Sequence, residues 1–290
     1  MFAFAHQVLS GLAMGSVYAS FALAIAMIYQ STRLVNFAQG EMAMFSTYLA
    51  WAMINAGLPY WVAFSLTVVL SFVLGAAIER LVIRRFDSAP VLTVVIVFIG
   101  LLVIINSVAG WLFTYSIKSF DSPFPESARF GGGYMSPHEM GAIGVTLTML
   151  ALIYVFFRFT SLGLAMRAVA QNPVSARLVG IRVGRMLAIG WGLAAAVGAV
   201  AGMMAAPIIY LDPNMMSGVL LYGFAAALLG GIDNPWGAVI GGFLVGVLEN
   251  IAGAYLVGSE IKLSVALAII IGVLVAKPSG LFGRVIVARV

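Results

Sequence analysis

A few carboxylate and amide side chains interrupt long apolar stretches of the chain, and they are its best candidates for chemistry. They are Asn36, Gln39, Glu41, Asn106, Glu249 and Asn250. If the stretches cross a membrane, such groups are costly to bury and commonly mark a path through it. Glu249 has no Lys or Arg near it in sequence, and a buried carboxylate must find a partner, face water or take up a proton. It therefore lines a path or makes a structural hydrogen bond, for which residues 36–41 are one candidate partner. For Asn106 the structural role is favoured.

The residue types needed for most catalytic sites are missing or badly spaced. The sequence holds no G-x-x-x-x-G-K-[ST], no H-E-x-x-H and no nucleophile elbow. Cysteine is absent, which excludes a thiol nucleophile and a thiolate metal site. His6 and His138 each stand alone, so neither predicts a metal ligand. We expect no enzymatic activity and no cofactor or metal in this chain.

The composition is that of a membrane protein. Of 290 residues, 63% are hydrophobic and 9% are charged, with a mean hydropathy of +1.10. Soluble domains carry about a quarter charged residues. The net charge of +5 forms no dense basic face, so nucleic acid is not an expected partner.

The apolar runs are long enough to cross about 30 Å of hydrocarbon as helices. They lie at about 8–29, 37–55, 60–79, 90–113, 141–158, 186–209, 236–257 and 262–277. The segment Gly218 to Gly231 is shorter and either spans or re-enters. The sequence thus predicts an all-α polytopic bundle of eight to nine spans in one transmembrane domain, residues 1–290, retained in the membrane.

Positive charges set the orientation, because Lys and Arg gather on the cytoplasmic side. With nine spans and the N-terminus outside, twelve Lys and Arg fall on one side and three on the other; a re-entrant 218–231 gives ten and five. Residues 81–89 and the loop of about 159–185 therefore face the cytoplasm, and residues 36–41 open their span near that side. Glu79 is expected in a solvated charge cluster beside Arg80. The loop of about 114–140 lies outside, where it contacts a partner or simply connects two spans.

Glycines recur four residues apart within the apolar runs. The pairs are Gly11 and Gly15, Gly198 and Gly202, Gly237 and Gly241, and Gly242 and Gly246. In lipid, this spacing allows helix backbones to approach closely. It favours tight static packing over walls that slide against each other.

The loop of about 159–185 predicts two short helices across the cytoplasmic mouth. Asn172 is suited to cap a helix whose first residue is Pro173, and Gly180 is suited to end it. Such a pair either docks in the groove of an aqueous subunit or lies on anionic lipid headgroups.

Three separated segments resemble one known family, the branched-chain amino acid ABC transporter permeases, and in particular the shorter of its two permeases. They are Arg167-Ala-Val-Ala-Gln-Asn-Pro-Val-Ser-Ala-Arg-Leu-Val-Gly-Ile, Asn36-Phe-Ala-Gln-Gly-Glu-Met and Ala227-Leu-Leu-Gly-Gly-Ile-Asp-Asn-Pro-Trp-Gly-Ala-Val-Ile-Gly-Gly. The resemblance covers essentially the whole chain. Many members carry His where Gln39 stands, so we assign no proton chemistry to that position.

The resemblance implies a heteromeric importer in the inner membrane of a bacterial cell. Its parts are two permeases, ATP-hydrolysing subunits that bind the ATP, and a soluble binding protein outside. The loop that couples to the ATPase then contains Arg167, Ala170, Asn172, Pro173, Ala176, Arg177 and Gly180.

The solute follows from the resemblance and not from any derived pocket: it is leucine, isoleucine or valine. One alternative is a permease of the same superfamily for urea, amides or another small polar solute. A second is an ion-driven carrier, which places coupling charges near the membrane midplane and for which Glu249 is the main candidate.

Overall fold

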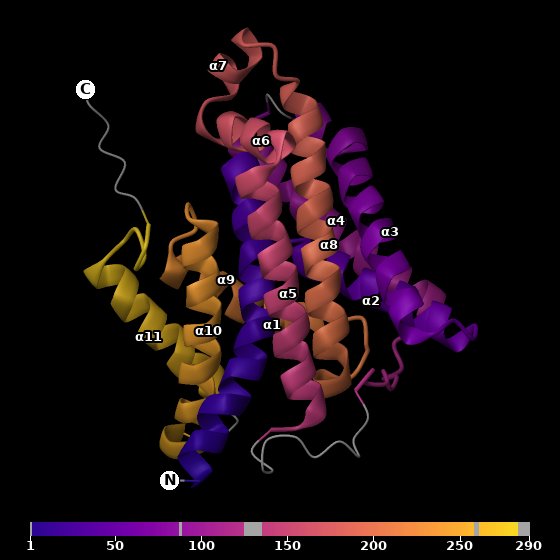
Figure 1. Cartoon of the computed structure of the whole chain (residues 1–290), viewed down its shortest axis with the longest axis vertical. Helices are drawn as coiled ribbons and strands as arrows, with labels where there is room; N and C mark the ends of the chain where they lie inside the picture. Colours follow the sequence, from indigo (N-terminus) through magenta and orange to yellow (C-terminus); the bar gives the residue numbers. More distant parts are fainter. Residues whose placement is uncertain (1, 87–88, 125–134, 258–260, 284–290) are drawn as a thin grey trace. The chain divides into compact units, whose positions relative to one another are not determined.

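A computed structural model describes residues 2–86, 89–124, 135–257 and 261–283. Within these ranges the chain is helical, apart from turns and one isolated antiparallel bridge. The helices, labelled in Figure 1, are α1 (Phe2–Thr32), α2 (Gln39–Asn55), α3 (Tyr60–Leu81), η1 (Ile83–Phe86), α4 (Val91–Phe113), α5 (Pro137–Phe159), α6 (Ser161–Gln171), α7 (Pro173–Leu178), α8 (Val183–Ile209), α9 (Met216–Gly230), α10 (Pro235–Ala252), η3 (Gly253–Val257) and α11 (Lys262–Ala276). The all-α prediction is confirmed.

Six helical stretches are long and apolar enough to cross a membrane. They are Phe4–Gln30, Tyr60–Phe86, Val91–Phe113, Pro137–Phe159, Val183–Ile209 and Pro235–Tyr255. Three shorter helices, α2 with 17 residues and α9 and α11 with 15 each, occupy the other predicted segments. At 1.5 Å per residue, 15 residues extend only about 22 Å, so α9 is shorter than a full span.

Helix α5 begins earlier than the apolar run suggested. Ser136 caps it, because the Glu139 amide donates to Ser136 Oγ at 3.1 Å and the Ser136 amide donates to Glu139 Oε2 at 2.7 Å. Pro137 takes the first helical position, where its missing N–H costs nothing. This reciprocal capping box extends the helix into the predicted 114–140 loop, whose residues 125–134 lie outside the described part of the chain.

The residues form two compact units that alternate along the chain. Unit 1 contains residues 1–26, 122–145 and 218–290, and unit 2 contains residues 27–121 and 146–217. The single domain over residues 1–290 stays a prediction.

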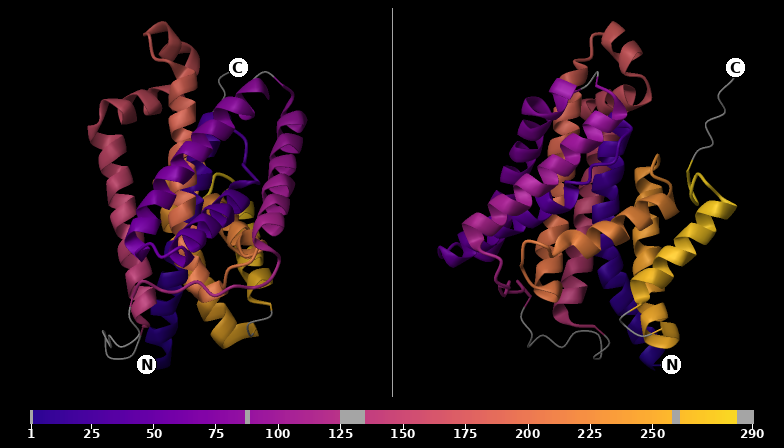
Figure 2. Two further views of the ribbon diagram at one scale, coloured as in Figure 1. Left: turned by 90° about the vertical axis from the view of Figure 1, so that its right-hand side faces the viewer. Right: turned by 180° about the vertical axis from the view of Figure 1, so that it is seen from behind.

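Unit 2 is built around α8, which packs along α3 and α2. Small residues permit the close approach: a Cβ on Gly75 of α3 would come within 2.6 Å of the Trp191 carbonyl oxygen, and one on Gly192 within 2.8 Å of the Phe72 carbonyl oxygen. Trp191 itself is fully buried. Helix α6 crosses from the end of α5 to α8, and α7 lies beyond it at the same end of the unit (Figure 2).

Unit 1 is held by glycine contacts between α1 and α10. A Cβ on Gly11 would come within 2.8 Å of the Val247 Cα, and one on Gly15 within 3.0 Å of the Phe243 Cα. From the other side, Cβ atoms on Gly242 and Gly246 would overlap the α1 backbone. The predicted small-residue pairs thus bring backbones together, where van der Waals packing stabilises helix association in lipid.

Candidate functional site

Helix α2 begins about halfway along α8. The chain leaves α1 at Thr32, runs without helix through residues 33–38 and enters α2 at Gln39. Gln39 Nε2 donates to the Ala194 carbonyl oxygen at 3.0 Å. Ala194 lies 11 residues after Val183, the first residue of the 27-residue α8, or about 16 Å along it. Residues 36–41 were expected near the cytoplasmic end of their span. The expectation is corrected, because α2 begins beside the middle of α8.

Two glycines of α8 make room for polar residues of α2. A Cβ on Gly198 would come within 2.6 Å of Gln39 Nε2, and one on Gly202 would overlap Thr47 Oγ1. Asn36 and Gln39 are fully buried. Asn36 Oδ1 accepts from the Ala38 amide at 3.0 Å, which fixes the turn that starts α2.

Asn106 of α4 joins Glu41 of α2 to the segment that precedes α9. Its Nδ2 lies 3.2 Å from Glu41 Oε2, 2.9 Å from the Pro213 carbonyl oxygen and 3.3 Å from Asn214 Oδ1. The Tyr115 hydroxyl donates to Asn106 Oδ1 at 3.4 Å. The structure therefore brings two predicted residues together, and we call Glu41, Asn106, Pro213, Asn214 and Tyr115 the amide cluster.

An aromatic row continues from the amide cluster between α2 and α4. Phe113 stacks on Tyr48, with ring centroids 4.7 Å apart, and meets Phe45 and Trp51 edge-on at 6.5 and 6.4 Å. Edge-on and offset-stacked pairs are the favourable arrangements of aromatic rings. The row gives the α2–α4 contact an apolar wall next to its polar cluster.

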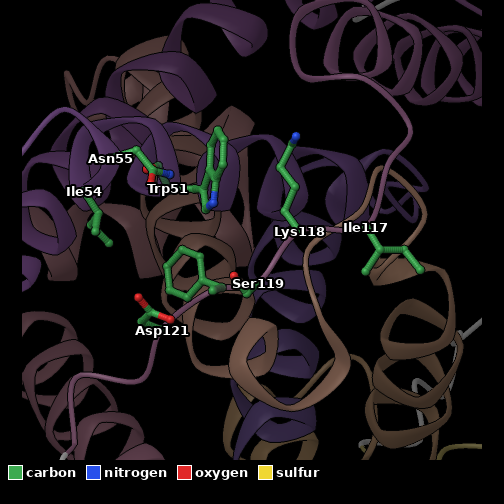
Figure 3. Close-up of a pocket in the computed structure, with 8 residues that line it drawn as sticks. Trp51, Ile54, Asn55, Ile117, Lys118, Ser119 and Asp121 are labelled. Atoms are coloured by element: carbon green, nitrogen blue, oxygen red, sulfur yellow. The ribbon is translucent and has the colours of Figure 1, made fainter.

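A pocket of about 350 Å³ opens beside the last turn of α2 (Figure 3). Its lining residues are Trp51, Ile54, Asn55, Ile117, Lys118, Ser119, Phe120 and Asp121. Lys118 Nζ lies 4.9 Å from the centroid of the Trp51 ring, within cation–π range. The backbone of Lys118 pairs with Leu211 through two hydrogen bonds of 2.9 and 3.0 Å, so this strand-like bridge fixes the pocket wall.

Glu249 and Asn250 belong to unit 1 and have partners there. The hydroxyls of Tyr18 and Tyr222, whose rings stack 4.8 Å apart, both hydrogen-bond to the Glu249 carboxylate. Glu249 is buried. Asn250 Nδ2 donates to the carbonyl oxygen and to Oε1 of Gln7, at 2.7 and 2.8 Å. These partners of Glu249 lie in unit 1 and are not residues 36–41, and a place for Glu249 on a path stays a prediction.

The two short helices predicted in the 159–185 loop are confirmed as α6 and α7. Asn172 Oδ1 accepts from the amides of Val174 and Ser175 at 3.0 Å each, and Pro173 is the first residue of α7. After α7 the chain turns at Gly180, whose φ is +83°, a conformation that favours glycine. The predicted N-cap and helix stop are both present.

One side of α6 and α7 is anchored and the other is exposed. Ala176 packs in an apolar cluster with Val169, Val183 and Met186. Leu178, by contrast, is 84% exposed. The remaining coupling candidates differ in their exposure to solvent. Ala170 is half-buried, and the exposed residues are Arg167, Asn172, Pro173, Arg177 and Gly180.

Sequence reasoning missed or misplaced several residues of unit 2. Glu79 was expected in a solvated cluster with Arg80, and this was wrong: Glu79 is 2% exposed and is paired to Arg84 through bonds of 3.1 and 2.6 Å. Tyr115 and Asn214 were not singled out, because each stands in a loop with no local pattern. The one signal in the sequence for this pair was the Arg five residues after Glu79.

Known proteins match this chain along nearly its whole length. Residues 7–274 match the sequence family described as branched-chain amino acid transport system / permease component. The high-affinity branched-chain amino acid transport system permease protein LivH of Escherichia coli K12 is 30% identical, covering 99% of this chain and 98% of that protein. The corresponding protein BraD of Pseudomonas aeruginosa PAO1 is 29% identical, covering 98% and 97%. Among solved structures, PsaBC from Streptococcus pneumoniae in complex with Fab aligns with a TM-score of 0.48 and 14% identity, covering 90% and 88%.

Proposed function

The chain belongs to the family of permease components of branched-chain amino acid transport systems, and from this premise we propose which solute it passes and which proteins it works with. It is a multi-pass membrane permease of an ABC importer. The proposed solutes are leucine, isoleucine and valine. The observation that carries this proposal is similarity over almost the full length to LivH and BraD, proteins named for branched-chain amino acid transport.

The proposed partners are a second permease, ATP-binding subunits and a soluble binding protein, in the inner membrane of a bacterial cell. The chain has no P-loop of its own, so ATP is bound by the partner subunit. Residues around 114–140 and 211–217 are the proposed contact for the binding protein. The pairing of Lys118 with Leu211 supports this surface, because it holds the start of the first segment against the start of the second.

Helices α6 and α7 are the proposed coupling element. Arg167, Ala170, Asn172, Pro173, Ala176, Arg177 and Gly180 belong to it. Short helices that lay exposed apolar side chains into a groove are a recurrent docking mode, and Val174 and Leu178 are exposed. The buried cluster around Ala176 supports transmission, because it ties α7 to α8 through Val183 and Met186. Movement imposed on α7 by the ATPase then displaces α8, against which the start of α2 is bonded.

The proposal is tested by purifying the tagged chain from native membranes and identifying the proteins that accompany it. Recovery of a P-loop ATPase, a second permease and a soluble binding protein is expected. Reconstituted with these partners, the complex is expected to take up leucine when ATP is supplied. Uptake of urea or an amide in place of leucine would overturn the proposed solute. Uptake by the lone chain under an ion gradient would overturn the proposed partners.

A charge reversal tests the coupling element. Arg167→Glu and Gly180→Pro are expected to insert normally and to lose ATP-dependent uptake. The first reverses a charge on the docking surface, and the second cannot adopt the φ of +83° in the turn after α7. Arg80→Glu, an exposed arginine outside α6 and α7, is the matched control. Substrate-stimulated ATP hydrolysis and uptake that remain intact in both α6–α7 variants would contradict docking at this site.

A further inference from the structure

The oxygens around the Asn106 side-chain nitrogen outnumber the hydrogens directed at them. The side-chain amide of Asn106 carries two hydrogens, yet its Nδ2 faces three oxygens within 3.3 Å: Glu41 Oε2, the Pro213 carbonyl oxygen and Asn214 Oδ1. Glu41 contributes a second carboxylate oxygen. Among the other donors of the cluster, the Tyr115 hydroxyl is directed at Asn106 Oδ1, and the Asn214 side-chain nitrogen donates to none of these oxygens among the described residues. At least one oxygen around Asn106 is therefore left for a donor from outside the cluster.

A primary ammonium group is the ligand that completes this arrangement, because it brings three donors, no acceptor and a positive charge. We propose that Glu41, Asn106 and the oxygens of Pro213 and Asn214 form the subsite for the α-ammonium group of the transported amino acid. This inference rests on the proposed function for the identity of the solute. It assigns the ammonium contact to α2, α4 and the segment before α9.

The location of Glu41 suits a charged contact. Glu41 stands in the first turn of α2, where the helix macrodipole stabilises a negative side chain. It is 8% exposed, whereas Asn214 and Tyr115 are exposed.

The aromatic row supplies the apolar half of the same subsite. Glu41, Phe45 and Tyr48 are spaced four and three residues apart, which places them on one face of α2. Asn106 and Phe113, seven residues apart, share a face of α4, and the two faces meet where Phe113 stacks on Tyr48. An amino acid held by its ammonium group at Glu41 can thus lay an aliphatic side chain along Phe45 and Phe113.

A buried donor on the same face is still without an acceptor. Tyr48 is fully buried, and its hydroxyl has no hydrogen-bond partner among the described residues. An unmade hydrogen bond at a buried hydroxyl is costly. The carboxylate of a zwitterion supplies the missing acceptor. An amino acid therefore brings donors for the oxygens near Asn106 and an acceptor for the Tyr48 hydroxyl.

The test measures binding by the purified membrane complex without its binding protein. The probes are 3-methylbutylamine, which is leucine without its carboxylate, and 4-methylpentanoate, which is leucine without its ammonium group. Binding is followed as the rise in thermal unfolding midpoint with probe concentration. The amine is expected to stabilise the wild-type complex. Glu41→Gln is expected to weaken the amine about tenfold, the size of one lost charged hydrogen bond.

Two further variants keep the result interpretable. Glu41→Asp retains the charge and is expected to recover part of the amine binding, which separates a lost contact from a failure to fold. Asp233→Asn removes a carboxylate in the turn between α9 and α10 and is expected to bind the amine like the wild type. No stabilisation by the amine, or unchanged amine binding in Glu41→Gln, would overturn the subsite. A wild-type complex that takes up no leucine overturns the proposed solute instead, so the two failures are distinguishable.

Discussion

Gly15 of α1 and Gly246 of α10 face each other with their backbones in contact, so that a Cβ on Gly246 would overlap the Gly15 Cα. The atoms that would be displaced are backbone atoms, which cannot rotate away as a long side chain can. Close approach of this kind gives the van der Waals contact that holds helices together in lipid. The contact indicates a fixed joint between α1 and α10.

Gly246→Val is therefore expected to destabilise the protein. Overpacking of a close-packed interior typically costs about 1–3 kcal/mol, and the value here should lie at the upper end because backbone must move. Thermal unfolding of the purified protein measures the change. Gly272→Val is the matched control, since a Cβ there meets nothing within 4 Å among the described residues. Equal stability of the two variants would contradict the fixed joint.

Arg84 stabilises a buried carboxylate and connects two helices. It pairs with Glu79 of α3 at 2.6 Å and also donates to the Gly184 carbonyl oxygen of α8. Because Glu79 is 2% exposed, Arg84→Ala leaves a buried charge without its partner and is expected to cost about 3 kcal/mol.

A double-mutant cycle tests this pair. Glu79→Gln combined with Arg84→Ala is expected to be more stable than Arg84→Ala alone, because no buried charge then remains. Chemical or thermal unfolding of the four proteins gives the coupling free energy. Additive effects of the two substitutions would show that the bonds contribute nothing beyond their separate side chains.

Local patterns in the sequence were sufficient for α6 and α7 but not for the amide cluster. The Asn172 cap depends on amides two and three residues away, so the tetrapeptide Asn-Pro-Val-Ser already contains its determinants. Asn106 instead meets Glu41 and Pro213 across 65 and 107 residues. Such contacts are decided by how helices pack, which hydrophobic periodicity does not encode.

The apolar runs were also limited in what they could predict. Apolar runs located the helices, because burial in hydrocarbon requires a continuous apolar stretch. They did not give the depth at which α2 begins, which is set by the Gln39 bond to Ala194 and by the space at Gly198. The sequence also contained one unused signal, the Ser136–Glu139 capping box that starts α5.

Gly198→Ala is expected to displace the start of α2. The new Cβ would come within 2.6 Å of Gln39 Nε2, so the flexible side chain must turn away and give up its bond to the Ala194 carbonyl oxygen. A buried amide without its partner costs about 1–3 kcal/mol. We expect a slower uptake rate together with lower thermal stability. Gly190→Ala on the same helix is the control, because its Cβ would lie at an ordinary 3.5 Å from Met166 Cε; equal behaviour of both variants would count against the Gln39 anchor.

The Asn172 cap is expected to matter more for coupling than for overall stability. Helix α7 has only six residues, too few to be stable alone, and the Asn172 side chain satisfies two of its free amides. Asn172→Ala should cost about 1 kcal/mol locally, which loosens α7 while the buried cluster around Ala176 still holds its far side. Uptake per ATP hydrolysed is then expected to fall several-fold, with little change in the unfolding midpoint. Asn172→Asp and Asn172→Ser keep a capping oxygen and should retain coupling. If both capping variants lost coupling as fully as Asn172→Ala, the amide side chain itself would be the contact with the ATPase, and the order of α7 would not be the controlling quantity.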